Sequence, residues 1–459
     1  MHLIFDNRIK FFGVALICIF YLAPQETTGG GNNKETLEII LAEGCGYYDS
    51  KAADELKSYL SRDKNLNIRI KSLKQVQNIH EGSIIIGQAA LDSGIISEKE
   101  LSEVGEQGYV IKCRDKKFYI AGGKYGGILD GVYRFLEEAG FRFYAQDAVI
   151  IPVRIEFKKF EDIKAKPFFE HNLKSRLQAS PGGVDKKLDS QWPRLSWEHT
   201  NQFLVPAAYY GKDHPEYYAK DENGDFYIKK EKYLRNVMPQ TMLCISNPEV
   251  RKIAKQRLKL WVNAKKEKKF FMVAQMDGLG WCQCEKCKAL DTVPGKVMTD
   301  RLLDYVNDLA KEIYKTNPDK IITILAYTDR TAPPPRVVKS LAPNVRVFLC
   351  VYPPEVKDKG HWFTHKLNRK FLPWYEGWLK KFPGQVYIYD YPYVSFNCLS
   401  FIHAHMFERI KRYAKDGIRG LHFNSCPFYM YSLFNYVASK LAWDPSLDTG
   451  TLVANFIAG

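Results

Sequence analysis

Residues 269–276 read KFFMVAQM, an apolar run that ends directly before Asp277. A short apolar run of this kind is typical of a strand that is buried on both faces. Helical patterns stand on both sides of it along the chain, and buried strands that alternate with helices predict a parallel sheet. We therefore interpret KFFMVAQM as a strand of a parallel sheet, with Asp277 at its carboxyl end.

Seven further strand candidates follow Pro167 in the sequence: FFEHNLKSRL, QFLVPAA, TMLCIS, KIITILAY, VRVFLCVY, QVYIYDY and IRGLHFN. Helical patterns lie between most of the later candidates, over residues 248–266, 296–314, 368–381 and 401–416. Eight strand–helix units in about 275 residues match the size of a (β/α)8 barrel. We expect residues 168–459 to form a TIM-type barrel in which KFFMVAQM is the fourth strand.

A smaller α/β domain is predicted before the barrel, over residues 34–155. Apolar strand patterns alternate there with short helices, and GYVIKCRDKKFYIAGG predicts a hairpin that turns at Asp115–Lys116. A helix is expected over 128–139. The pattern fits a three-layer α/β domain, joined to the barrel by a linker at 156–167. The fold class is therefore α/β.

The first 30 residues have the pattern of a secretory signal peptide followed by a flexible tract. Arg8 and Lys10 precede the apolar run FFGVALICIFYLA, which is short for a membrane span. We expect cleavage between Ala23 and Gly31, while Cys18 raises lipid attachment as an alternative. No later run is long enough to cross a membrane, so we expect an exported protein that is periplasmic, surface-located or secreted.

The chain has an excess of positive charge. Its 67 Lys and Arg against 52 Asp and Glu give 67 − 52 = +15. Such a charge either serves solubility or favours anionic partners such as acidic glycans. The densest basic run, residues 251–269, has apolar residues at helical spacing and reads as a solvated helix face, so we expect no nucleic-acid partner. The pattern leaves the oligomeric state open.

Two parts of the chain resemble known families. GGKYGGILDGVYRFLEEAGFRFY resembles the end of the small α/β domain that precedes the catalytic barrel of α-glucuronidases and β-hexosaminidases. The motifs HPEYYA, CISNPEV, DGLGWCQCEKC, LAYTDRTAPPP, VYIYDYPY and KLAWDP are similar to an exported bacterial domain family of unknown function with a glycoside-hydrolase-like barrel. The resemblance implies a glycoside hydrolase that acts on a complex or acidic glycan. Members of that family continue beyond a motif like FIAG, so we expect the barrel to be truncated at its C-terminus.

Candidate site residues follow from the strand ends, because active groups of a barrel gather at the carboxyl ends of its strands. Glycoside hydrolysis normally needs two carboxylates. The candidate catalytic carboxylates are Asp277, Glu355 and Asp390. The candidate substrate contacts are His214, Glu216, Tyr327, Tyr391, Asn424 and Trp281.

Gly278 supports a different interpretation. The resemblance to β-hexosaminidases implies an Asp–Glu pair at the end of the fourth strand, where Glu is the general acid. Here Asp277 is followed by Gly278. The alternative function is therefore a non-catalytic glycan-binding barrel that has lost its acid.

Four cysteines form a second candidate site. Cys282, Cys284 and Cys287 follow Asp277 closely, and with Cys244 they supply the four thiolates of a closed structural zinc site. Export favours disulfides instead, either Cys284–Cys287 or one of the three with Cys244. In either case the role is structural, because the cluster would fix the loop that carries Asp277. The predicted chemistry requires no cofactor, and a zinc-stabilised scaffold with an unrelated partner stays open as a third function.

Overall fold

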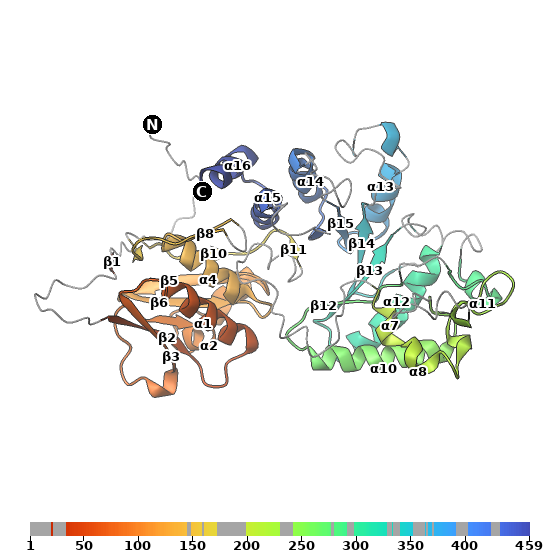
Figure 1. Ribbon diagram of the computed structural model, residues 1–459, viewed down its shortest axis with the longest axis horizontal. Helices are drawn as coiled ribbons and strands as arrows, with labels where there is room; N and C mark the ends of the chain where they lie inside the picture. Colours follow the sequence, from red (N-terminus) through yellow and green to blue (C-terminus); the bar gives the residue numbers. More distant parts are fainter. Residues whose placement is uncertain are drawn as a thin grey trace, which may run out of the picture. The chain divides into compact units, whose positions relative to one another are not determined.

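The computed structural model describes residues 20–21, 34–144, 148–157, 160–171, 199–229, 242–276, 280–291, 298–327, 333, 340–351, 363, 366–369, 371–391, 403–423 and 432–459. The chain divides into two compact units (Figure 1). Unit 1 comprises Met1–Arg142 and Ile150–Lys166, and unit 2 comprises Phe143–Val149 and Pro167–Gly459. No described helix combines the length and apolar character that a membrane crossing requires.

Unit 1 is built on a six-stranded mixed sheet in the order β10-β5-β6-β4-β2-β3. Its elements are β2 (Glu35–Leu41), α1 (Tyr47–Leu60), β3 (Leu66–Ser72), η1 (Leu73–Gln75), β4 (Ile84–Ile86), α2 (Gln88–Asp92), α3 (Glu98–Val104), β5 (Tyr109–Arg114), β6 (Lys117–Gly122), α4 (Gly127–Glu138) and β10 (Ile163–Ala165). Strands β3, β2, β4 and β6 run parallel, whereas β5 and β10 are antiparallel to their neighbours. Short pairs join β1 (Phe20–Tyr21) to β9 (Glu156–Phe157) and β7 (Arg142–Phe143) to β8 (Val149–Ile150).

The sheet of unit 1 buries both faces, which makes the unit three-layered. Ile40, Ile85 and Val110 pack with residues of α2 and α3 in one cluster. Neighbouring positions point to the other face, where Phe118 of β6 contacts Phe135 of α4 with ring centroids 5.0 Å apart. Alternate side chains of a strand point to opposite faces, so a sheet covered on both sides has apolar residues at every position.

The predicted hairpin is confirmed. Strands β5 and β6 pair antiparallel, and Arg114 faces Lys117 across the turn. Asp115 and Lys116 both have positive φ, at 48° and 58°. Two consecutive residues in that region form the type I′ turn, whose twist matches that of the strands it joins. Beyond the hairpin, Gly122 lets α4 approach the sheet, because a Cβ there would lie 1.8 Å from the backbone nitrogen of Ile128.

Unit 2 contains a six-stranded parallel sheet in the order β11-β16-β15-β14-β13-β12. Its strands are β11 (Glu170–His171), β12 (Phe270–Met272), β13 (Ile321–Ala326), β14 (Val345–Cys350), β15 (Val386–Asp390) and β16 (Gly420–Phe423). Its helices are α7 (Asn201–Leu204), α8 (Ala207–Tyr210), η2 (Pro215–Tyr217), η3 (Tyr227–Lys229), α10 (Pro248–Ala264), α11 (Glu285–Lys288), α12 (Thr299–Tyr314), η5 (Lys366–Asn368), α13 (Phe371–Lys381), α14 (His403–Lys415), α15 (Ser432–Trp443) and α16 (Thr449–Ala458).

The described strands make a half-barrel, and a complete eight-stranded barrel stays a prediction. The first strand along the chain, β11, pairs with the last, β16, which is the pairing that a closed barrel requires. The two outer strands also approach one another, since Lys269 Nζ, just before β12, lies 2.9 Å from Glu170 Oε1 of β11. Burial alone would raise the pKa of Glu170, but the Lys269 ammonium and a hydrogen bond from Tyr387 hold it below its usual value.

The later strand predictions are confirmed and two earlier ones are wrong. QFLVPAA forms parts of α7 and α8, because Pro206 has no N–H for a strand ladder and instead begins a helical turn at Ala207. The described part of TMLCIS forms no strand, and only Leu243 makes an isolated bridge, to Tyr218. The predicted helices correspond to α10, α12, α13 and α14.

Candidate functional site

The four cysteines singled out in the sequence lie together in unit 2. Cys244 precedes α10, Cys282 and Cys284 precede α11, and Cys287 lies within α11. Their sulfur atoms all lie within 4.8 Å of one another. Cys244 Sγ is 3.8 Å from Cys284 Sγ and 3.9 Å from Cys287 Sγ. Two segments about forty positions apart therefore bring four thiols to one point.

The sulfur separations can be compared with those of a disulfide and of a metal centre. Disulfide sulfurs are about 2.05 Å apart, and the four cysteines are free thiols in the structure. A tetrahedral ion with metal–sulfur bonds of about 2.3 Å separates its sulfurs by about 3.8 Å. The separations of Cys244 Sγ from the sulfurs of Cys284 and Cys287 are close to the second geometry. This geometry favours a metal site, and the disulfides considered from the sequence stay the alternative prediction.

Polar groups surround the sulfurs. Cys287 Sγ lies 3.1 Å from Ser246 Oγ, and the backbone N–H of Lys220 donates to Cys282 Sγ at 3.5 Å. Hydrogen bonds from the thiols of Cys244 and Cys282 lower the pKa of Cys287 to about 2. Hydrogen bonds with Cys282 and Cys287 raise the pKa of Cys244 above its usual value.

A buried ion pair anchors the far end of the cysteine loop. Arg301 of α12 and Asp291 both have fully buried side chains. Arg301 Nε donates to Asp291 Oδ1 at 2.7 Å, and Nη2 donates to Oδ2. Arg301 Nη1 also donates to the carbonyl oxygen of Cys282 at 2.8 Å. Arg301 thus contacts both ends of the segment from Cys282 to Asp291, and the sulfur cluster includes the end at Cys282.

Trp281 was predicted to stack on sugar rings, and the structure buries it instead. Only 6% of its surface is exposed, and the Arg301 guanidinium lies 5.8 Å from its ring centre. In this position the ring packs against the core of unit 2. Its contact with substrate stays a prediction, and the geometry favours a packing role.

Asp390 ends β15 and is fully buried. Its carboxylate accepts hydrogen bonds from Arg409 Nη2 at 3.0 Å, Tyr413 Oη at 2.7 Å and the backbone N–H of Tyr391 at 2.7 Å. Burial and the adjacent Asp390 carboxylate raise the pKa of Tyr413 well above its usual value. These three hydrogen bonds indicate a structural role, in which Asp390 fixes the side chains of Arg409 and Tyr413. Catalysis by Asp390 stays a prediction that this geometry does not favour.

Two tyrosines stand at strand ends, as the sequence predicts. Tyr327 follows β13 and is half-buried, and Tyr391 follows β15 and is buried, with its ring centre 5.2 Å from that of Tyr389. Three predicted site residues, Asp277, Glu355 and Asn424, lie outside the described residues. In the sequence they follow β12, β14 and β16.

His214 and Glu216 form an exposed pair beside η2. His214 Nδ1 lies 3.0 Å from Glu216 Oε1, and the His214 ring stacks on Tyr217 at 4.6 Å between centres. This segment contacts both cysteine segments, since the backbone N–H of Cys244 donates to Tyr217 and that of Gln283 donates to Lys220. His214 and Glu216 therefore belong to a segment that packs beside the sulfur cluster. Contact of these two residues with substrate stays a prediction.

The model of a domain of unknown function, DUF4838, matches residues 145–459, which is more than half of the chain. The chain belongs to the DUF4838 family. No curated protein matches it. The DUF4838 match covers nearly all of unit 2, including the sulfur cluster and every predicted site residue.

Two solved structures share weak similarity with this DUF4838 protein. "Structure of CpGH84D" has a TM-score of 0.41 at 9% identity, over 93% of this chain and 68% of the other. A "GH138 enzyme targeting pectin rhamnogalacturonan II" has a TM-score of 0.34 at 10% identity, over 90% of this chain and 51% of the other. The chain thus spans about half the length of the second protein. Similarities of this size assign no activity.

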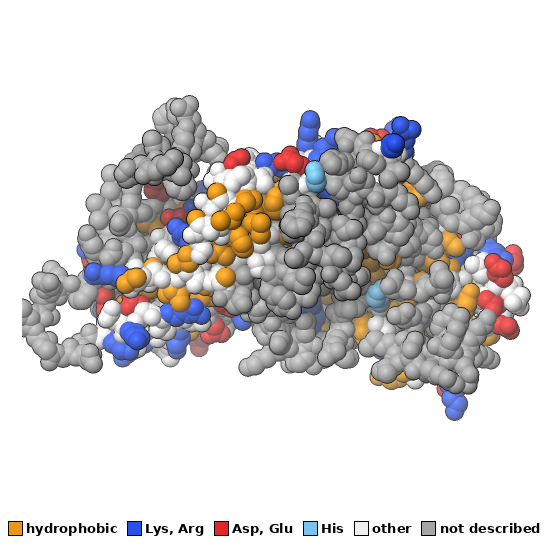
Figure 2. All heavy atoms as spheres, turned by 45° about the horizontal axis from the view of Figure 1, so that its top comes forward, with side chains coloured by type: hydrophobic (Ala, Val, Ile, Leu, Met, Phe, Trp, Pro, Cys, Tyr) orange, Lys and Arg blue, Asp and Glu red, His pale blue; other side chains and the backbone are white. Residues whose placement is uncertain are grey.

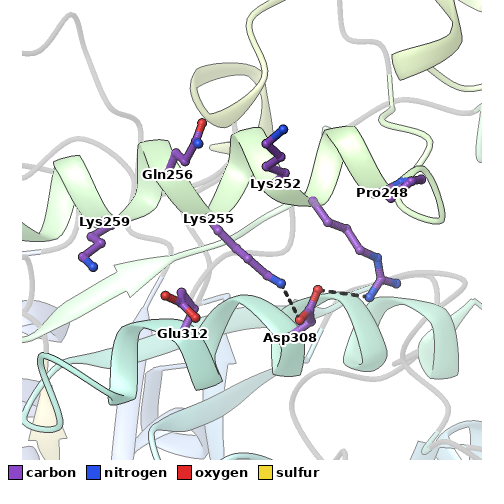
Figure 3. A pocket seen from close by; sticks show the side chains of 8 residues that line it. Pro248, Lys252, Lys255, Gln256, Lys259, Asp308 and Glu312 are labelled. Carbon is purple, nitrogen blue, oxygen red and sulfur yellow. Dashed lines mark hydrogen bonds and ion pairs between the residues drawn. The ribbon is translucent and has the colours of Figure 1, made fainter.

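A groove on the helical surface of the DUF4838 domain is separate from the strand ends. It has a volume of about 470 Å³ and lies between α10 and α12 (Figure 3). Ion pairs line it, since Asp308 of α12 contacts Lys255 Nζ at 2.7 Å and Arg251 Nη1 at 3.4 Å. These pairs join two packed helices, so we interpret the groove as a helix–helix contact.

Among the described residues, positive charge does not gather in one field on the face shown in Figure 2. The described Lys and Arg side chains there lie in separate places across the surface, with acidic side chains near several of them. Many of the described cations are paired with acids, as Lys252 is with Glu249 at 3.3 Å. Within the described part of this face, the charge is distributed rather than concentrated.

Proposed function

We propose that unit 2 acts on glycans, as an exported glycoside hydrolase whose site lies at the carboxyl ends of its parallel strands. The observation that carries the proposal is the pairing of β11 with β16 in a sheet of six parallel strands. The first and last strands are neighbours, so the carboxyl ends of all six strands lie along one curved edge.

Sugar-binding residue types follow these strand ends in the sequence. Asp277 follows β12, Tyr327 follows β13, Glu355 follows β14 and Tyr391 follows β15. Carboxylates supply the acid and base of glycoside hydrolysis, and tyrosines offer both an apolar ring face and a hydroxyl. Because Asp390 is committed to Arg409 and Tyr413, we assign the acid–base work to Asp277 and Glu355.

Two further features support the proposal. The motifs that resemble a glycoside-hydrolase-like barrel span the same unit as the DUF4838 match. The apolar run after Arg8 and Lys10 supports export, which would bring the protein to polysaccharides outside the cytoplasm.

Gly278 favours one alternative, a glycan-binding barrel without catalysis. A hexosaminidase-type site would have its general acid at this position, and the chain has glycine. The two functions share the same edge of the sheet and the same class of ligand. They differ in whether a bound glycan is cleaved.

The test is a panel of uronic-acid and N-acetylhexosamine glycosides and acidic polysaccharides, assayed for cleavage and for binding. The variants are Asp277→Asn and Glu355→Gln, which keep side-chain shape while they remove the charge. Glu285→Gln is the matched control, because Glu285 lies in the same loop and its side chain is 92% exposed.

Cleavage by the wild type and by Glu285→Gln, with loss of at least 100-fold in Asp277→Asn, would support the hydrolase. Binding without cleavage in every variant would select the glycan-binding alternative. Absence of both cleavage and binding over the whole panel would contradict a glycan function.

A further inference from the structure

The sulfur cluster is a second site of the chain, independent of any glycan function. We infer that it binds one zinc ion through four thiolates, those of Cys244, Cys282, Cys284 and Cys287, and that this centre fixes the loop that follows β12.

The donor set selects the class of ion. Thiolates are soft ligands, and four of them suit zinc, which has no geometric preference of its own and is held tetrahedrally in structural sites. The groups that hard cations such as Mg²⁺ and Ca²⁺ require are carboxylate and carbonyl oxygens, and the four-residue cluster of possible metal ligands contains none. Four protein ligands also leave no open position, which is typical of a structural rather than a catalytic ion.

The spacing of the sulfurs agrees with one central ion. The separations of 3.8 Å from Cys244 to Cys284 and 3.9 Å from Cys244 to Cys287 equal the edge of a tetrahedron with metal–sulfur bonds of about 2.3 Å. The remaining separations stay within 4.8 Å. The four sulfurs are therefore close enough together to share one ion.

The surroundings supply the hydrogen bonds that such a centre needs. Four thiolates and one Zn²⁺ leave a net charge of −2, and donors directed at the sulfurs stabilise it. The backbone N–H of Lys220 already donates to Cys282, and the hydroxyl of Ser246 lies 3.1 Å from Cys287 Sγ and 3.8 Å from Cys284 Sγ. Three of the four cysteines are buried, so water competes little for the ion.

The position of the four cysteines in the chain determines which segments a zinc ion would link. Cys282 lies five positions after Asp277 in the sequence. Cys244 lies four positions before Pro248, the first residue of α10. An ion between them would link the loop after β12 to the start of α10. A third segment already contacts both, since Lys220 hydrogen-bonds to Cys282 and Gln283, and Tyr217 accepts from the backbone N–H of Cys244. Removal of the ion should therefore loosen the loop next to Asp277 before it unfolds the parallel sheet.

The experiment measures zinc in the full chain, purified with a reductant and without a chelator. Elemental analysis of the wild type should give about one zinc per chain. Cys284→Ser should lose its zinc on dialysis against a chelator that leaves the wild type loaded. Cys45→Ser is the matched control, since Cys45 is also a half-buried free thiol but lies in unit 1, and it should keep the wild-type zinc content.

A second measurement does not depend on the folding of a variant. Replacement of zinc by Co²⁺ in the wild type should give the intense sulfur-to-cobalt charge-transfer absorption of tetrahedral thiolate coordination, and added Zn²⁺ should abolish it. Weak octahedral cobalt spectra, iron in place of zinc, or equal zinc loss in Cys45→Ser and Cys284→Ser would each overturn the inference. So would protein without metal whose four cysteines resist alkylation until they are reduced, because that result identifies disulfides.

Discussion

Replacement of Arg301 by methionine should destabilise unit 2 strongly. The Arg301 and Asp291 side chains are both fully buried, and two hydrogen bonds join them. Arg301→Met keeps the length of the apolar stem but leaves the Asp291 carboxylate buried without its cation. Breaking a buried pair in this way costs about 3–5 kcal/mol. In the pair of Arg412 with Asp416 the arginine side chain is 48% exposed, and a pair that solvent screens contributes about 0–1 kcal/mol.

The assay can report unit 2 alone. All eight tryptophans of the chain lie between positions 192 and 443, so none is in unit 1. Urea unfolding followed by tryptophan fluorescence should show a fall of about 3–5 kcal/mol in Arg301→Met and at most about 1 kcal/mol in Arg412→Met.

A double variant separates the buried charge from simple loss of packing. Arg301→Met combined with Asp291→Asn removes the uncompensated charge and should recover at least about 1 kcal/mol relative to Arg301→Met alone. An Arg301→Met protein within about 1 kcal/mol of the wild type would refute the argument, because it would show that Asp291 is not held as a buried anion.

Two further predictions concern unit 1. Burial alone would raise the pKa of Glu100, but hydrogen bonds from Lys112, Ser97 and Lys164 lower it to about 2. A lowered folded-state pKa contributes stability above the unfolded pKa of 4.5, and this contribution is lost as the pH falls from 4.5 towards 2. The melting temperature, followed by circular dichroism, should therefore fall less in Glu100→Gln than in the wild type over that range; equal falls would contradict the assignment. Replacement of Asp115–Lys116 by Asn–Gly should raise the stability of unit 1 by about 0.5–1 kcal/mol, because both positions have positive φ. A lower stability of this variant, measured by circular dichroism, would argue against the type I′ turn.

The sequence predicted the strands whose continuous apolar runs match their burial on both faces of the sheet. VRVFLCVY and QVYIYDY are buried on both faces of a parallel sheet, so their continuous apolar runs identify them as strands. QFLVPAA misled the interpretation, because a short apolar run has no period that separates a strand from a buried helical turn. Within it, Pro206 is the one residue that argues against a central strand, and it stands directly before α8.

The sequence also predicted some features of the candidate site and missed others. The spacing of the cysteines identified the cluster, but spacing cannot distinguish a disulfide from a metal site. The separations between the sulfur atoms favour a metal site, and the zinc analysis proposed above tests that choice. Arg301 and Asp291 were not singled out from the sequence, since one charge on an amphipathic helix and one in a loop normally face solvent. Asp390 was selected as a strand-end acid, and its partners Arg409 and Tyr413 come from a helix that follows it in the chain.

The most direct test of the central claim is diffraction from crystals of the full chain, recorded on both sides of the zinc absorption edge. The account predicts one anomalous difference peak, present only above the edge, at about 2.3 Å from each of Cys244, Cys282, Cys284 and Cys287 Sγ. Continuous density between two of these sulfurs at about 2.05 Å, with no anomalous peak, would contradict it.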